Sequence, residues 1–438
     1  MVFAQIIMVI ALLAMISGKV PLYLTAFVGA VLAALVAGIP VNVALAPAGW
    51  EGTAAETLMG MMQASGLHPV ILDMLGILLF IGIMEKVGFL HSIILWVIRV
   101  GHKLGGGPGI ATAGGIAAGI IGAFTGFTQP AITGVITGPP AVEMGVDKNR
   151  VAGILAHAGH LGNFGGFTHP TIVGVVAITA IGWGWINVVG AVVALSIFAA
   201  SFIRLRGMMK KEGTLGKKVD LNLEASEIPV LKAFIPFIIL IVAFILGVPV
   251  VLAGIGSALI VILMTIRNFQ KGEKDMMDGL VRITVPLFAT VAFLFMARIV
   301  NEIGLVALVV DAMPDTTTPL VLLLILFLIG AFTGLVTQSN GASAPIVFAV
   351  LPVLGAVGVN PFVAAVAAAA GPALMQYYLT GGPVAALSTV IPVIPGSDLK
   401  LANRFQRPSI LWGMAVALVI TVVLGLILPT VAPGSWGA

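Results

Sequence analysis

The hexapeptide IGAFTG occurs twice in this chain, at 121–126 and again at 329–334. Each copy stands in an apolar stretch rich in glycine and threonine, followed by FTQPAITG after the first copy and LVTQSNGASAP after the second. Further pairs of residues match at a nearly constant offset: Gly88 with Gly304, Gly145 with Gly358, Asp147 with Asn360, and Pro170 with Pro383. The pattern indicates an internal duplication, and in a membrane protein paired Gly/Pro interruptions of this kind point to a ligand site.

The composition requires lipid as the solvent for most of the chain. Hydrophobic residues make up 60% of the sequence and charged residues only 9%, and the mean hydropathy is +1.17. A soluble domain of this length cannot bury so much apolar surface. Cysteine is absent, which excludes disulfides and thiolate chemistry. The apolar N-terminal segment has no basic n-region, so we expect a first spanning helix and not a cleaved signal.

Apolar runs long enough for a hydrocarbon core about 30 Å thick indicate a polytopic protein. Spans are expected at about 3–18, 20–45, 68–86, 150–181, 186–205, 231–246, 248–266, 284–300, 361–391 and 408–430. Two other stretches, 108–140 and 318–356, are each too long for one span and are interrupted near the middle. Irregular backbone at membrane depth is tolerated only where it lines protein or water, so both stretches are predicted to be re-entrant helical hairpins.

Basic residues set the expected orientation. With these spans, nearly all lysines and arginines fall on one side, whereas the loops 46–56 and 301–317 contain acids and no lysine or arginine. Basic loops face the cytoplasm. The 206–230 loop is therefore expected in the cytoplasm and both termini outside, with the protein in the inner (plasma) membrane of a prokaryote.

The predicted fold is an all-α membrane protein made of two inverted-topology repeats. Each repeat has about five transmembrane helices and one re-entrant hairpin, and an odd number of crossings inverts the second repeat. Discontinuous helices are expected at the midplane. The expected parts are the first repeat 1–205 with an arm 88–103, hairpin 108–140 and broken helix 150–181, the linker 206–230, and the second repeat 231–438 with an arm 303–314, hairpin 318–356 and broken helix 361–391.

Polar residues at the hairpin tips and helix breaks are the candidate ligands, because a broken helix offers a positive N-terminus to an anion and carbonyls to a cation. Residues expected to bind substrate are Thr128, Gln129, Asn163, Thr168, His169, Gln338, Ser339, Asn340, Gln376 and Thr380. Residues expected to serve a coupling ion, sodium or a proton, are Thr125, Thr337, Ser343, His160 and Asp73. No cofactor and no metal beyond sodium is expected. The competing interpretation is that small residues only allow close helix packing.

Two residues have open roles. His157 stands one turn before His160 and either takes part in a proton relay or only bonds a backbone carbonyl. Arg298 either attracts a carboxylate or, as favoured here, pairs with Glu302 one turn on and extends its charge toward the interface.

The layout resembles the ion transporter superfamily of secondary carriers. MEKVGFLHSIILWVIRVGHKLGGGPG leading into GAFTGFTQPAITG, and GVDKNRVAGILAHAGHLGNFGGFTHPTIVG after it, are similar to the large membrane subunit of tripartite ATP-independent periplasmic carriers. GLVTQSNGASAPIVFAV is similar to the second hairpin of the lactate permease family, and gluconate permeases have a similar arrangement. The Ser-Asn-Thr signature of sodium-coupled dicarboxylate carriers is absent, with Thr128-Gln129-Pro130 and Gln338-Ser339-Asn340 in its place.

The expected function is cation-coupled secondary transport of a small organic anion, a carboxylate, by an elevator-type mechanism. The resemblance implies a homodimer in the lipid bilayer, and a small membrane subunit and a binding protein are possible partners. No arrangement of residues typical of an enzyme is found, and no nucleic-acid partner is expected. The alternatives are a cation/proton antiporter, the large membrane subunit of a binding-protein-dependent carrier, and a channel or passive scaffold.

Overall fold

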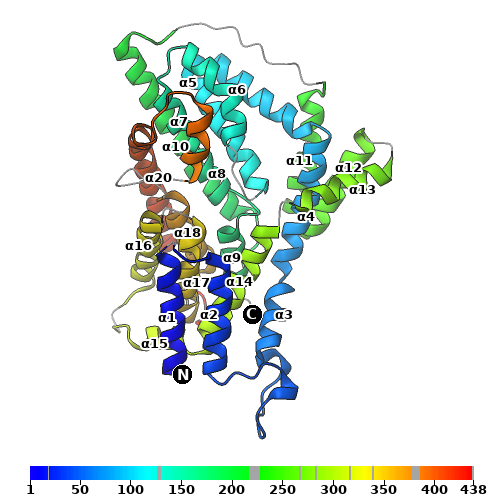
Figure 1. Ribbon diagram of the computed structural model, residues 1–438, viewed down its shortest axis with the longest axis vertical. Helices are drawn as coiled ribbons and strands as arrows, with labels where there is room; N and C mark the ends of the chain where they lie inside the picture. The colour runs from blue at the N-terminus through cyan, green and yellow to red at the C-terminus, as the bar shows by residue number, and fades with distance from the viewer. Residues whose placement is uncertain are drawn as a thin grey trace.

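The computed structural model is all-helical (Figure 1) and describes residues 1–17, 19–125, 130–216, 227–265, 268–281, 284–314, 317–337, 340–375 and 385–436. Five of its described helices are long and apolar enough to cross a membrane, or six if the bent pair α14–α15 counts as one span. The other apolar helices are shorter, at 10–17 residues. The chain is therefore a multi-span integral membrane protein, as the composition predicts.

The helices of the first half run up to the linker near residue 216. They are α1 (Val2–Ile16), α2 (Leu22–Val36), η1 (Val43–Leu45), η2 (Ala54–Glu56), α3 (Leu58–Gly66), α4 (Pro69–Lys86), α5 (Phe89–Thr125), α6 (Pro130–Glu143), α7 (Lys148–Ala156), α8 (Ala158–Phe164), α9 (Pro170–Thr179) and α10 (Trp185–Glu212).

The helices of the second half begin at Val230. They are α11 (Val230–Ile245), α12 (Val250–Thr265), α13 (Phe269–Leu280), α14 (Thr284–Glu302), α15 (Leu305–Asp311), α16 (Pro319–Thr337), α17 (Asn340–Ala356), α18 (Pro361–Leu374), α19 (Ala385–Val390), η4 (Ile391–Val393) and α20 (Leu399–Ile427).

Several expected span limits need correction. α2 ends at Val36, well before the expected limit near 45, because Gly38 takes a left-handed φ of 82° and Pro40 follows. α10 and α20 extend beyond the expected spans, since their charged ends continue the helix outside the apolar run. Two short helices, α3 and α13, stand before α4 and α14, outside the expected spans.

The arm and the first hairpin are joined at a sharp break inside α5. Gly106 has φ 56° and ψ −133°, a backbone conformation open to glycine and strained for other residues. The chain reverses there so tightly that a Cβ on Gly109 would lie 2.0 Å from the carbonyl oxygen of Gly101. The arm therefore folds back, and Leu90 and Ile98 pack in one cluster with Ala117 of the hairpin.

The second half has its own bend at the corresponding place. α14 and α15 meet at an angle of 55°, and Gly304 between them has a φ of 70°. This bent pair fits the expectation of an arm over 303–314 at the end of a span.

The two halves exchange packing partners in a reciprocal way. α12 of the second half packs on α4 of the first, and α2 of the first half packs on α14 of the second. The short helix α13 also packs on α4, and the short helix α3 packs on α14. Glycines permit the closest of these contacts, since a Cβ on Gly254 would lie 2.4 Å from the backbone of Gly76. In Figure 1 α11, α12 and α13 lie together beside α4.

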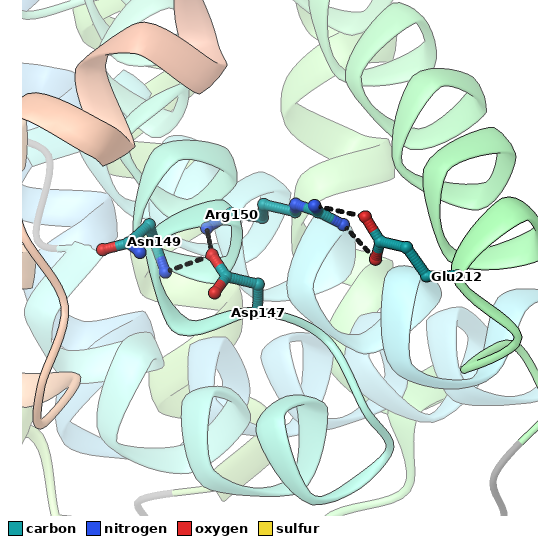
Figure 2. A network of polar contacts seen from close by, with 4 residues as sticks. All are labelled: Asp147, Asn149, Arg150 and Glu212. Carbon is teal, nitrogen blue, oxygen red and sulfur yellow. Dashed lines mark hydrogen bonds and ion pairs between the residues drawn. The ribbon is translucent and has the colours of Figure 1, made fainter.

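The loops gather at two ends of the molecule. At one end Asp147 caps α7 and Arg150 forms an ion pair of 2.6 Å with Glu212 at the end of α10 (Figure 2). The amide of Asp398 donates to Asn149 at this same end. The other end holds the N-terminus of α1, α3 and α15 (Figure 1).

The centre of the bundle is built from small side chains. All residues from Val363 to Leu374 of α18 are buried, most of them alanine. A Cβ on Gly371 would lie 2.5 Å from the backbone nitrogen of Ala331, so α18 and α16 are in backbone contact. Such packing brings the end of α18, where the second break was predicted, into the interior.

Candidate functional site: a helix break beside the first hairpin

Residues 121–125 and 329–333, the two IGAFT sequences, adopt the same local structure. Thr125 Oγ1 donates to the carbonyl of Ile121 at 2.9 Å, and Thr333 Oγ1 donates to the carbonyl of Ile329 at 2.8 Å. Both threonines are buried in the first helix of their hairpin segment. Each hydroxyl thus donates its hydrogen to the preceding turn of its own helix.

The other matched pairs also agree in conformation. Gly88 and Gly304 have φ of 81° and 70°, and Gly145 and Gly358 have φ of 88° and 79°. Asp147 and Asn360 follow the second pair of glycines, and their side chains accept backbone N–H groups at the starts of α7 and α18. The sequence matches therefore reflect the same turn and the same helix start in each half.

The broken helix of the first half has its interruption where the sequence predicts it. α8 ends at Phe164 and α9 begins at Pro170. Between them the amide of Phe167 donates to the carbonyl of Ala123 in the hairpin at 2.6 Å. The break is thereby fixed to the last turn of the first hairpin helix.

Asn187 of α10 holds the break from the other side, and the sequence analysis missed it. Its Nδ2 donates to the carbonyl of Gly166 at 2.6 Å, and its Oδ1 accepts the amide of Gly184 at 3.0 Å. The residue is 4% exposed. An Asn in an apolar helix indicates a buried polar contact, because a lone amide in lipid is costly. Its partner could not be identified from the sequence, since Gly166 lies about twenty residues upstream.

His160 of α8 connects the first broken helix to α18 of the second half. Its Nδ1 lies 3.1 Å from the carbonyl oxygen of Ala373, near the end of α18. Since a carbonyl only accepts, His160 Nδ1 carries the hydrogen here and Nε2 is left as an acceptor. α8 and α9 both contact α18, so the discontinuous helices form one packed unit.

His157 has a supporting role in this unit. It is fully buried, with Nε2 2.7 Å from Ser201 Oγ and its ring 5.5 Å from that of His160. The sequence left open a proton relay or a bond to a backbone carbonyl, and the hydrogen-bond partner of Nε2 is a hydroxyl of α10. His157 therefore joins α7 and α8 to α10.

Two further predicted ligands lie in the break. The Thr168 hydroxyl is fully buried and has no hydrogen-bond partner among the described residues. Asn163 is partly exposed. An unpaired buried hydroxyl costs stability unless a ligand or water completes it. His169 uses Nδ1 to accept the amide of Thr171 and so caps α9.

The remaining predicted residues divide into two groups. Thr337 Oγ1 donates to the carbonyl of Thr333 at 2.7 Å, and Ser343 is fully buried in α17. Asn340 begins α17, but its side chain lies outside the described part of the chain. Outside it altogether lie Thr128, Gln129, Gln338, Ser339, Gln376 and Thr380.

Asp73 lies apart from the breaks. Its Oδ2 accepts the indole N–H of Trp183 at 3.1 Å, and its Oδ1 accepts the amide of Val251 in the first turn of α12 at 3.3 Å. It therefore joins α4 to α12 and to the loop before α10. The prediction that Arg298 pairs with Glu302 is wrong: within the described residues the ion pairs are Lys86–Asp278 and Arg150–Glu212.

Aromatic rings line the boundary between the break and the neighbouring helices. Phe124 of the hairpin stacks on Phe167 of the break, with ring centroids 5.5 Å apart. Phe237 of α11 contacts Phe124, and Phe244 contacts Phe167. No group of three or more His, Cys, Asp or Glu residues suited to hold a metal is found among the described residues.

The solved structure of the YdaH transporter from Alcanivorax borkumensis matches this chain with a TM-score of 0.59 and 16% sequence identity. The match covers 84% of this chain and 87% of that protein. The fold is that of a solved membrane transporter. At this identity the likeness concerns the fold alone. No family model and no curated protein matches the sequence.

Proposed function

We propose that this protein is a cation-coupled secondary transporter of a small organic anion, most simply a carboxylate. The proposal rests most on the break between α8 and α9, where the Thr168 hydroxyl has no hydrogen-bond partner among the described residues, and on the contact of α8 with α18 through His160 and Ala373. α9 starts at Pro170 directly after this break, so the positive end of the helix lies at the break. A positive helix end beside a spare hydroxyl suits one small anion.

In this proposal the two halves are inverted repeats that enclose the site from opposite sides. The shared conformations of the matched glycines and the reciprocal packing of α2 with α14 and α12 with α4 support it. Hairpin α5–α6 then enters from the cytoplasm and α16–α17 from outside, with both termini outside and the basic end of α10 in the cytoplasm. The polar residues at 128–129 and 338–340 complete the site.

Transport by an elevator-type movement fits the boundary around the break. The stacked pair Phe124 and Phe167 meets Phe237 and Phe244 of α11 through ring contacts. Such contacts are apolar and weakly directional, so they can re-form after one body slides past another. The moving body is the hairpins with α7–α10 and α18–α20, and the fixed body is α1–α4 with α11–α14, which carries the surface for a homodimer.

The coupling ion is sodium or a proton. Sodium takes hard oxygen ligands, which Thr125, Thr337, Ser343 and the carbonyls of the breaks supply. A proton has an acceptor in His160 Nε2, because Nδ1 is already committed to Ala373. Asp73 is less suited, since Trp183 and Val251 already occupy its oxygens.

The proposal is tested by a thermal-shift screen of monocarboxylates, dicarboxylates and sugar acids, each with and without sodium and at two pH values. We expect one carboxylate class to raise the melting temperature in a sodium- or pH-dependent manner. Thr168→Val should leave the ligand-free melting temperature unchanged or higher, because it removes an unpaired buried hydroxyl, and should abolish the ligand shift. Thr168→Ser, which keeps a hydroxyl, should retain the shift.

Absence of any carboxylate shift, with stability that depends on cations alone, would refute the organic-anion proposal and favour a cation/proton antiporter. A shift that persists in Thr168→Val would remove the break from the site. Transport of the identified compound by the purified chain in liposomes would exclude dependence on a partner subunit.

A further inference from the structure

A cavity of about 1030 Å³ lies away from the helix breaks. It is lined by the start of α4, the end of α9, the turn between α11 and α12, the end of α14, and residues near the C-terminus. In the proposed topology each of these ends faces outside. The cavity therefore separates the proposed moving body from the fixed body on that side, and an anion arriving from outside must cross it.

The two charged residues of this cavity differ in their hydrogen-bond partners. Asp73 and Arg298 both line it, but they form no ion pair with each other within the described residues. The oxygens of Asp73 accept from the Trp183 indole and from the first turn of α12, so each of them already has an N–H donor. Arg298 is exposed to the cavity and keeps the donors of its guanidinium available.

His68 adds a second donor to the same wall. Its Nδ1 accepts the amide of Val70 at 3.3 Å and so caps α4. In the neutral ring the hydrogen is then on Nε2, and His68 is half-buried at the cavity. The cavity thus presents N–H donors of a histidine and an arginine, and its one carboxylate is already occupied.

We propose that Arg298 is the centre of a vestibule site that binds the carboxylate of a small anion before it reaches the helix breaks. A planar guanidinium matches a carboxylate in a bidentate manner. The vestibule is distinct from the hairpin tip, because Ser343 and the cavity residue Pro352 are nine residues apart on α17, about 14 Å at 1.5 Å per residue. This inference rests on the proposed function in one respect, namely that the anion that enters the cavity is a carboxylate.

The vestibule can be tested without any transport assay, because Trp183 and Trp436 line the same cavity. In a background with Trp50, Trp96, Trp185 and Trp412 replaced by Phe, their fluorescence is quenched with iodide, an anion, and with acrylamide, which is neutral. Both quenchers are used in detergent at constant ionic strength. The purified variants are first compared for melting temperature and size.

Removing the charge by Arg298→Gln should lower iodide quenching about twofold, as expected for one unit charge several ångströms away in a water-filled cavity, and leave acrylamide quenching unchanged. Arg298→Lys should retain part of the effect, and Lys103→Gln, an exposed lysine of the arm, should have none. Adding acetate in place of chloride should reduce iodide quenching only where Arg298 is present.

Equal iodide quenching in the Arg298→Gln and parent proteins would overturn the vestibule, and it would show that the arginine serves only as an interfacial charge. If Arg298→Gln lowers iodide quenching but acetate does not reduce the quenching of the parent protein, carboxylate binding at Arg298 is also overturned. Neither result bears on the thermal-shift screen, which reports on the breaks.

Discussion

At the residue scale, the groups that hold the site differ from those with unused bonding capacity. Asn187 and the amide of Phe167 tie the break to α10 and to the hairpin. Thr168 keeps an unpaired hydroxyl. The sequence identifies Thr168 because it stands in a Gly-rich interruption. It does not identify Asn187, since a pairing between two helices depends on how they pack and no local pattern records it.

The support role of Asn187 predicts a loss of stability in the absence of any ligand. Asn187→Ala leaves the buried carbonyl of Gly166 without its donor, which should lower the free energy of unfolding by about 1–3 kcal/mol. The free energy of unfolding in bicelles can be measured directly by steric trapping. Gln63→Ala, an exposed amide of α3, is the matched control and should change stability by less than about 0.5 kcal/mol. Equal effects of the two substitutions would contradict the role.

At the element scale, glycines decide where the helices end and turn. The first break lies between α8 and α9, and the chain turns at Gly106 and Gly304, at places where Gly and Pro interrupt an apolar run of the sequence. α13 lies outside the expected spans because its charged residues interrupt the apolar pattern. Only its contact with α4, where Gly279 meets Gly82, reveals why it is ordered.

The turn between arm and hairpin predicts a conformational cost at one residue. A Cβ on Gly106 would meet nothing within 4 Å, so Gly106→Ala should act through backbone strain alone and destabilise the protein by roughly 1–3 kcal/mol. Gly207→Ala, in an open place within α10, should instead stabilise it by about 0.5–1 kcal/mol. If Gly106→Ala is neutral in the same unfolding measurement, the turn does not require glycine.

At the scale of the whole molecule, the central claim is that the hairpins and broken helices form one body that moves against the rest. The duplication was visible in the sequence, because matched glycines leave a local signature. The interdigitation of α2 with α14 and α12 with α4 was not, since it depends on contacts between segments far apart in the chain. The large cavity follows from that arrangement and has no sequence signal of its own.

The absence of cysteine makes the most direct measurement simple, because spin labels can be placed without removing native thiols. Leu263→Cys on α12 and Val135→Cys on α6 mark the two bodies at exposed positions, 67% and 60% accessible. Leu411→Cys on α20 with Val135→Cys marks the moving body alone. In nanodiscs, pulsed electron–electron double resonance should give an α6–α12 distance that shifts by several ångströms with the coupling ion and the identified anion, while the α6–α20 distance stays constant. A single α6–α12 distance that is unchanged under all of these conditions would contradict the account.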